Sequence, residues 1–165
     1  MKKIEFKVCG SEKMILLGKL LTSFAYPNLV IALNGDLGCG KTTFTKGIGI
    51  ALGIKRVINS PTFTIMKTYE VTNKVNNIEM LYHLDVYRLN NSADDFSLSE
   101  YFEWGGLTVI EWAEIIDDLL PDNLWKMVIK NDGENQRIVE LEFLDDTNYL
   151  DVETVLRSND YEIIN

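Results

Sequence analysis

The sequence of 165 residues contains few cysteines, prolines and histidines: two, three and one, respectively. The cysteines, Cys9 and Cys39, lack the spacing of metal ligands. Such a low cysteine content excludes a disulfide scaffold and is typical of a reducing compartment. The apolar runs are too short to cross a membrane, and the first residues carry charges where a signal peptide needs an apolar core. We therefore expect a cytoplasmic protein with no membrane partner.

The sequence also lacks internal repeats, low-complexity runs and a linker rich in proline or glycine. A chain of this length is typical of one domain and buries about 70% of its unfolded surface on folding. Hydrophobic residues make up 46% and charged residues 25%, which excludes a disordered or collagen-like chain.

Charge is unevenly distributed along the chain. Residues 1–75 contain eleven Lys and Arg against four Asp and Glu, a net charge of +7. Residues 76–165 contain five against twenty-one, a net charge of −16. The overall charge of −9 should repel nucleic acid, so we expect no DNA partner. The basic half can hold an anion such as a nucleotide and the acidic half a basic partner; the alternative is two solvated faces of opposite sign.

The order of the predicted elements is typical of an α/β domain. Alternating or continuous apolar residues predict strands over residues 2–8, 29–33, 62–71, 78–87, 107–110, 125–129 and 137–143. Helical spacing predicts one helix with Ser11 as its N-cap and a second helix from Thr42 to Leu52. Polar turns predict that the third and fourth strands, and the last two, form β-hairpins.

A glycine-rich turn lies between the buried strand at 29–33 and the second predicted helix. Residues 35–42 read G-D-L-G-C-G-K-T and fit the phosphate-binding pattern G-x-x-x-x-G-K-[ST]. Its glycines allow backbone conformations in which successive N–H groups form an anion nest before a helix N-terminus. Lys41 can reach the β- and γ-phosphates, and the Thr42 hydroxyl can bind Mg²⁺. Cys39 is interpreted as a small residue and not as a reactive thiol.

An enzyme with such a loop needs an acidic residue near the metal, at the end of a buried strand. Glu111 closes the apolar strand at 107–110 and is the better placed candidate. Asp85 lies within the strand at 78–87 and shares one face of it with His83, whose simplest interpretation is a core histidine.

Several classes of nucleotide-binding protein fit the sequence poorly. It lacks the D-x-x-G and N-K-x-D motifs of a GTPase, and its length excludes large mechanochemical ATPases. A small-molecule kinase usually has an arginine-bearing lid, whereas this chain has four scattered arginines. Such a kinase, or a nucleotide-sensing module without relevant hydrolysis, stays open as an alternative.

Four linked motifs resemble those of the TsaE (YjeE) family, the bacterial ATPases of tRNA threonylcarbamoyladenosine synthesis. They are G-D-L-G-C-G-K-T-T at 35–43, S-P-T-F-T at 60–64, L-Y-H-L-D-V-Y-R-L at 81–89 and I-E-W at 110–112. The resemblance implies a P-loop NTPase-like α/β fold with a mixed, mostly parallel sheet flanked by helices. It also implies a Mg²⁺-dependent ATP hydrolase that acts beside the TsaB and TsaD proteins. Those proteins modify the adenosine next to the anticodon, so tRNA would be reached only through the complex.

The resemblance also implies roles for single residues. Lys41 and Thr42 match the phosphate-binding lysine and the Mg²⁺ ligand, and Glu111 matches the acid at the metal. Asp85 matches a second acid, and Thr62 matches a switch-like threonine near the γ-phosphate. The expected catalytic residues are thus Lys41, Thr62, Asp85 and Glu111, and the expected metal ligands are Thr42 and Glu111. The expected nucleotide-binding residues are Ser11, Asp36, Leu37, Gly38, Cys39, Gly40, Lys41, Thr42, Thr43, Trp112 and Arg137.

The resemblance ends near Phe143. We expect residues 1–144 to form the P-loop ATPase domain. Residues 145–165 extend past the family pattern, and their apolar residues have helical spacing, which predicts a helix packed on the domain.

Overall fold

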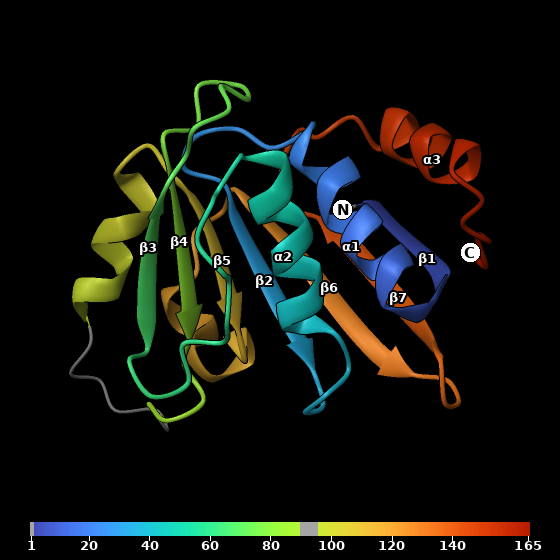
Figure 1. Cartoon of the computed structure of the whole chain (residues 1–165), viewed down its shortest axis with the longest axis horizontal. Coiled ribbons are helices and arrows are strands. Elements are labelled where there is room, and N and C mark those ends of the chain that lie inside the picture. Colours follow the sequence, from blue (N-terminus) through green and yellow to red (C-terminus); the bar gives the residue numbers. More distant parts are fainter. Residues whose placement is uncertain (1, 90–95) are drawn as a thin grey trace.

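The computed structural model describes residues 2–89 and 96–165 as a seven-stranded sheet with helices on both faces (Figure 1). The strand order is β1-β7-β6-β2-β5-β4-β3. The four central strands are mutually parallel, and antiparallel pairs β1–β7, β6–β7 and β3–β4 complete the two sides. The predicted mixed α/β fold is therefore confirmed, with five of the seven strands running in one direction.

The elements follow one another in an order close to that predicted. The strands are β1 (Lys2–Cys9), β2 (Val30–Gly35), β3 (Met66–Glu70), β4 (Met80–Asp85), β5 (Leu107–Glu111), β6 (Leu124–Asn131) and β7 (Gln136–Phe143). The helices are α1 (Gly10–Thr22), α2 (Lys41–Ala51) and α3 (Tyr149–Ser158), with the 3₁₀-helices η1 (Phe96–Glu103) and η2 (Ala113–Leu119).

The sheet separates two layers of core, because successive side chains of a strand point to opposite faces. In β2, Ile31 and Leu33 belong to the core that α1, α2 and α3 cover, whereas Val30 and Ala32 belong to the core under η1 and η2. Each face of β2 is therefore buried, as expected for a central parallel strand with a continuous apolar sequence.

Helices α1 and α2 lie side by side on one face of the sheet (Figure 1). Their contact depends on two glycines: a Cβ on Gly18 would lie 2.2 Å from the Phe44 carbonyl oxygen, and one on Gly47 would lie 2.0 Å from that of Ile15. This close approach places the N-terminus of α1 next to the loop that precedes α2.

Two local predictions were wrong. Helix α1 begins at Gly10, so Ser11 lies inside its first turn, and Cys9 occupies the N-cap position without a side-chain bond that caps the helix. The strand expected at 62–71 begins only at Met66, because residues 62–64 form a turn and Ile65 adopts a left-handed φ of 67°. Both 3₁₀-helices were missed, since their short apolar patterns have no clear period.

The C-terminal residues pack against strand β1 and the core on the face of the sheet that α1 and α2 cover. In α3, Val152 and Leu156 are fully buried in the core shared with α1 and α2, and the isolated bridge Phe6–Ile163 follows. The division into a domain at 1–144 and an extension at 145–165 stays a prediction. None of the helices in the described residues has the length and apolar character needed to cross a membrane.

Candidate functional site

The glycine-rich loop connects β2 to α2 at the carboxyl end of the parallel strands. Gly40, which precedes α2, has a φ of 118° and no side chain to cap the helix. The first N–H groups of α2 therefore stay available to an anion, with the positive end of the helix dipole behind them. At Gly35, with φ 150°, a Cβ would lie 2.5 Å from the Ile129 carbonyl oxygen, so the loop can pass β6 only with glycine there.

Lys41 is the first residue of α2, and its side chain bends back over the loop. Its Nζ donates to the carbonyl oxygens of Gly35 at 2.6 Å and Asp36 at 3.1 Å. The same Nζ lies 4.2 Å from the centroid of the Trp112 ring, a cation–π distance. Lys41 as a whole residue is only 5% exposed, and the loop carbonyl oxygens hold its ammonium at the point where a phosphate chain would enter.

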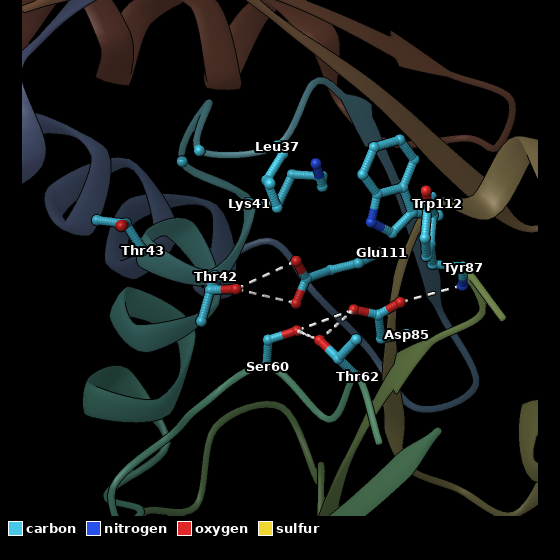
Figure 2. A pocket seen from close by; sticks show the side chains of 12 residues that line it. Leu37, Lys41, Thr42, Thr43, Ser60, Thr62, Asp85, Tyr87, Glu111 and Trp112 are labelled. Carbon is cyan, nitrogen blue, oxygen red and sulfur yellow. Dashed lines mark hydrogen bonds between the residues drawn. The ribbon is translucent and has the colours of Figure 1, made fainter. Parts of the chain in front are cut away.

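Thr42 contacts the acid at the end of β5. Its hydroxyl lies 3.1 Å from each carboxylate oxygen of Glu111, which is only 3% exposed (Figure 2). His83 in β4 is fully buried, and its Nε2 lies 2.6 Å from Oε2 of the same carboxylate, within hydrogen-bond distance. The Glu111 carboxylate is thus bonded from two sides by side chains of different elements.

A second acidic group, Asp85, ends β4 next to Glu111 in the register of the sheet. Its Oδ2 accepts the hydroxyls of Ser60 at 2.9 Å and Thr62 at 3.2 Å, and its Oδ1 accepts the backbone N–H of Tyr87 at 3.0 Å (Figure 2). The loop between α2 and β3 is therefore tied to the carboxyl end of β4 through one carboxylate.

Trp112 follows Glu111 in a left-handed conformation, with φ 61° and ψ 36°. A bulky residue rarely adopts this conformation, because its Cβ crowds the backbone. The backbone N–H of Trp112 donates to the Leu33 carbonyl oxygen at 3.0 Å, and the centroid of its ring lies 4.9 Å from that of the Tyr87 ring. The unusual turn brings the indole over Lys41, which a continuation of β5 would not do.

Most of the predicted site residues line one cavity of about 480 Å³. Its lining residues are Leu37, Gly38, Gly40, Lys41, Thr42, Thr43, Ser60, Thr62, Asp85, Tyr87, Glu111 and Trp112. Ser60 and Tyr87 belong to the motifs singled out in the sequence but were not predicted as site residues. Strand alternation, which places Tyr87 on the same face as Asp85, could have indicated Tyr87, and the hydroxyl of Ser60 in the S-P-T-F-T motif could have indicated Ser60.

Three further predicted residues lie around a smaller cavity of about 220 Å³ on the other side of the loop. Ser11, Cys39 and Arg137 line it together with Asn135, which the sequence did not suggest. The Arg137 Nε donates to the Cys39 carbonyl oxygen at 3.0 Å, so β7 holds the loop from this side. Gly38, Gly40 and Thr43 line both cavities and make them neighbours.

Asp36 and Cys39 occupy loop positions that do not line the larger cavity. Asp36 is exposed, and its carbonyl oxygen, which accepts from Cys39 N at 3.1 Å, closes the turn. The Cys39 side chain is 1% exposed, and burial raises the pKa of its thiol, against the opposing effect of Lys41 nearby. A buried thiol with a raised pKa is a poor nucleophile, which agrees with its interpretation as a small residue.

The chemistry of the side chains fits a magnesium ion bound together with phosphate groups. The Thr42 hydroxyl and the Glu111 carboxylate are hard oxygen ligands that lie side by side at the helix N-terminus. The described residues contain no cluster of three or more His, Cys, Asp and Glu with the geometry of a metal site. Few protein ligands suit Mg²⁺, which usually keeps waters and takes further oxygens from the phosphates of a nucleotide.

The chain is similar to known proteins in both sequence and fold. The sequence profile of the family described as "Threonylcarbamoyl adenosine biosynthesis protein TsaE" matches residues 9–139. The chain is 43% identical over 137 residues to the tRNA threonylcarbamoyladenosine biosynthesis protein TsaE of Bacillus subtilis, covering 83% of this chain and 84% of that protein. It is 38% identical over 134 residues to the protein of the same name from Rickettsia felis, covering 80% and 75%. The crystal structure of YdiB from Bacillus subtilis superposes with a TM-score of 0.76 at 35% identity, over 96% of this chain and 97% of that one.

Proposed function

Because the chain belongs to the TsaE family of tRNA threonylcarbamoyladenosine biosynthesis proteins, we propose that it is a Mg²⁺-dependent ATPase. We further propose that its hydrolysis of ATP acts on a complex of the TsaB and TsaD proteins. The observation that carries the first proposal is the single cavity in which the glycine loop, the Thr42–Glu111 pair and the Asp85 network meet.

The phosphate chain of ATP would lie along the loop. Lys41 is then expected to exchange its bonds with the Gly35 and Asp36 carbonyl oxygens for bonds with the β- and γ-phosphates. Thr42 and Glu111 would hold the metal, which when bound neutralises charge on the phosphate oxygens. Trp112 covers Lys41 and would keep bulk water away from the ammonium.

Thr62 gives the site a way to respond to the γ-phosphate. Its hydroxyl is held only by Ser60 and Asp85 within the described residues, and both bonds can exchange for a phosphate oxygen. The segment 60–64 is followed by Ile65, a β-branched residue with a φ of 67°, and this conformation stores strain. A strained, hydroxyl-anchored loop is the kind of element whose order can depend on a γ-phosphate.

The cavity lacks a cation for the transferring phosphoryl group other than Lys41, among the residues that line it. Arg88 lies outside, with its guanidinium carbon 4.6 Å from the centroid of the Phe63 ring. Phosphoryl transfer commonly needs a further positive group, and one delivered by a partner can add about 10³–10⁵ in rate. We therefore expect slow hydrolysis by the isolated protein and faster hydrolysis in the complex.

Exposed apolar side chains around the cavity support docking of a protein there. Leu37, Phe63 and Tyr87 are 88%, 83% and 55% exposed, and all three lie on segments that form the cavity or adjoin it. Large exposed apolar groups beside a polar site are typical of interaction surfaces. The net charge of −16 in residues 76–165 opposes direct contact with tRNA, which would be reached through the partners.

The decisive experiment is steady-state ATP hydrolysis with and without added TsaB–TsaD complex, with Thr62→Ala as the matched variant. We expect turnover to rise with the partners, to require Mg²⁺ and to fall in the variant. Association measured with ATP and ADP should differ, and docking through the acidic half should weaken with salt. Equal rates with and without partners, and no ATP-dependent association, would reject the mechanism. A phosphorylated metabolite in a parallel screen would instead favour the small-molecule kinase.

A further inference from the structure

His83 lies in β4, diagonally opposite Glu111 across the parallel pair β4–β5. The register pairs His83 with Val109 and Asp85 with Glu111, so the imidazole sits one pleat before the carboxylates. The ring is fully buried, and its Nε2 is 2.6 Å from Oε2 of Glu111. The buried imidazole of a central strand thus makes a short, direct contact with the proposed metal-binding carboxylate.

The imidazole has no other polar contact that would explain its burial. Its Nδ1 finds no hydrogen-bond partner among the described residues, so the bond to Glu111 is the one that satisfies the ring. An ionised carboxylate only accepts, which makes Nε2 the donor. An apolar side chain would fill the same space without burying an unpaired nitrogen, so fold stability alone does not favour a histidine here.

Resting on the proposed function, we propose that His83 is the positioning residue of Glu111. Rotation about the terminal torsion of a glutamate is soft, so a single contact leaves the carboxylate plane free to turn. Here the His83 Nε2 holds Oε2, and the Thr42 hydroxyl lies 3.1 Å from both oxygens. The Thr42 hydroxyl is itself a proposed metal ligand, so His83 is the anchor that stays in place when the metal binds.

The test compares His83→Leu, which removes the donor, with His83→Gln, whose amide N–H can still donate to Glu111. Thr108→Val is the control, because Thr108 lies in neighbouring β5, is fully buried and has a hydroxyl without a partner in the part of the chain that the structure describes. The measurements are the Mg²⁺ concentration that half-saturates ATP binding, ATP affinity in EDTA, kcat and KM, and a thermal melt of each variant.

We expect His83→Leu to raise the half-saturating Mg²⁺ concentration by about 10–100-fold, the usual effect of losing a residue that orients a metal ligand. ATP affinity in EDTA should stay within about twofold, and kcat should fall more than KM rises. His83→Gln should restore part of the Mg²⁺ affinity. The control Thr108→Val should leave the half-saturating Mg²⁺ concentration, the ATP affinity, kcat and KM unchanged. A Mg²⁺ requirement of folded His83→Leu within twofold of the wild type would overturn the proposal.

A second measurement needs neither nucleotide nor metal. Unfolding free energies of His83→Leu, Glu111→Ala and the double variant form a cycle, and we expect a clear departure from additivity because the side chains touch. Additive effects would overturn the proposal. A wild type that needs no Mg²⁺ would remove the proposed function and this inference together, whereas a Mg²⁺-dependent wild type with an unchanged His83→Leu removes the inference alone.

Discussion

Replacement of Lys41 by alanine tests whether the loop works as a phosphate-binding site. In the structure the Lys41 ammonium has two carbonyl acceptors, at 2.6 and 3.1 Å, and one aromatic face at 4.2 Å. All three contacts hold the charge at the loop, and a phosphate would replace the weaker, neutral acceptors with charged ones. Lys41→Ala therefore removes a cation that is already placed, not one that must be recruited.

The size of the effect follows from the kind of bond that is lost. Hydrogen bonds to charged groups are worth about 1.5–3 kcal/mol, which corresponds to roughly ten- to a hundredfold in affinity. Charge that develops in the transition state adds to this loss, so hydrolysis should fall further than binding. We expect Lys41→Ala to bind ATP at least tenfold more weakly and to lose measurable hydrolysis.

Two assays measure these effects. Intrinsic fluorescence can follow binding, because Trp112 contacts Lys41 directly, and phosphate release gives the turnover. Lys46→Ala is the matched control, since this exposed lysine lies on the same helix α2 away from the cavity. Hydrolysis by Lys41→Ala within twofold of the wild type, with Lys46→Ala unchanged, would refute the phosphate-binding interpretation of the loop.

Three further changes have definite expected outcomes. Glu111→Gln should lower Mg²⁺-dependent hydrolysis at least about tenfold, because the Thr42 hydroxyl then faces a neutral amide; full activity there with none in Asp85→Asn would reverse the two acids. Gly47→Ala should lower the melting temperature by about 2–10 °C, because its Cβ would lie 2.0 Å from the Ile15 carbonyl oxygen. Glu140→Gln should cost about 0.2–1 kcal/mol of unfolding free energy at neutral pH, measured in urea.

The predictions for Gly47→Ala and Glu140→Gln each have a control. Ile50→Ala, at an exposed position of α2, should leave the melt unchanged, and a similar loss in both variants would contradict the glycine contact. The pKa of the Glu140 carboxyl is held below its ordinary value chiefly by a hydrogen bond from Lys3. Its stabilisation is thus present above the ordinary pKa and lost as the pH falls through the lower folded pKa. A Glu140→Gln effect that persists in acid would contradict this cause.

Local chemistry in the sequence was enough to predict the loop, the buried strand before it and the helix after it. Gly40 and Lys41 are required by backbone conformation and charge within a few residues, so no distant contact decides them. Gly35 has a positive φ as well, but the close approach of Ile129 in β6 also requires glycine there. The apolar run at 29–33 likewise predicted a strand that is covered on both faces. The resemblance to the TsaE family rested on the same short motifs and is confirmed by the comparisons.

Tertiary structure decided which distant groups meet at the loop. The contact between His83 and Glu111 depends on β4 and β5 being parallel neighbours, and the bond from Ser60 to Asp85 depends on how an irregular loop returns to the sheet. Tertiary structure also decided the left-handed conformations of Trp112 and Ile65 and the second cavity at Arg137. Sequence periodicity reports which side of an element is buried, but the neighbour that buries it is chosen by long-range packing. The site is therefore a local phosphate-binding loop that the order of the strands completes.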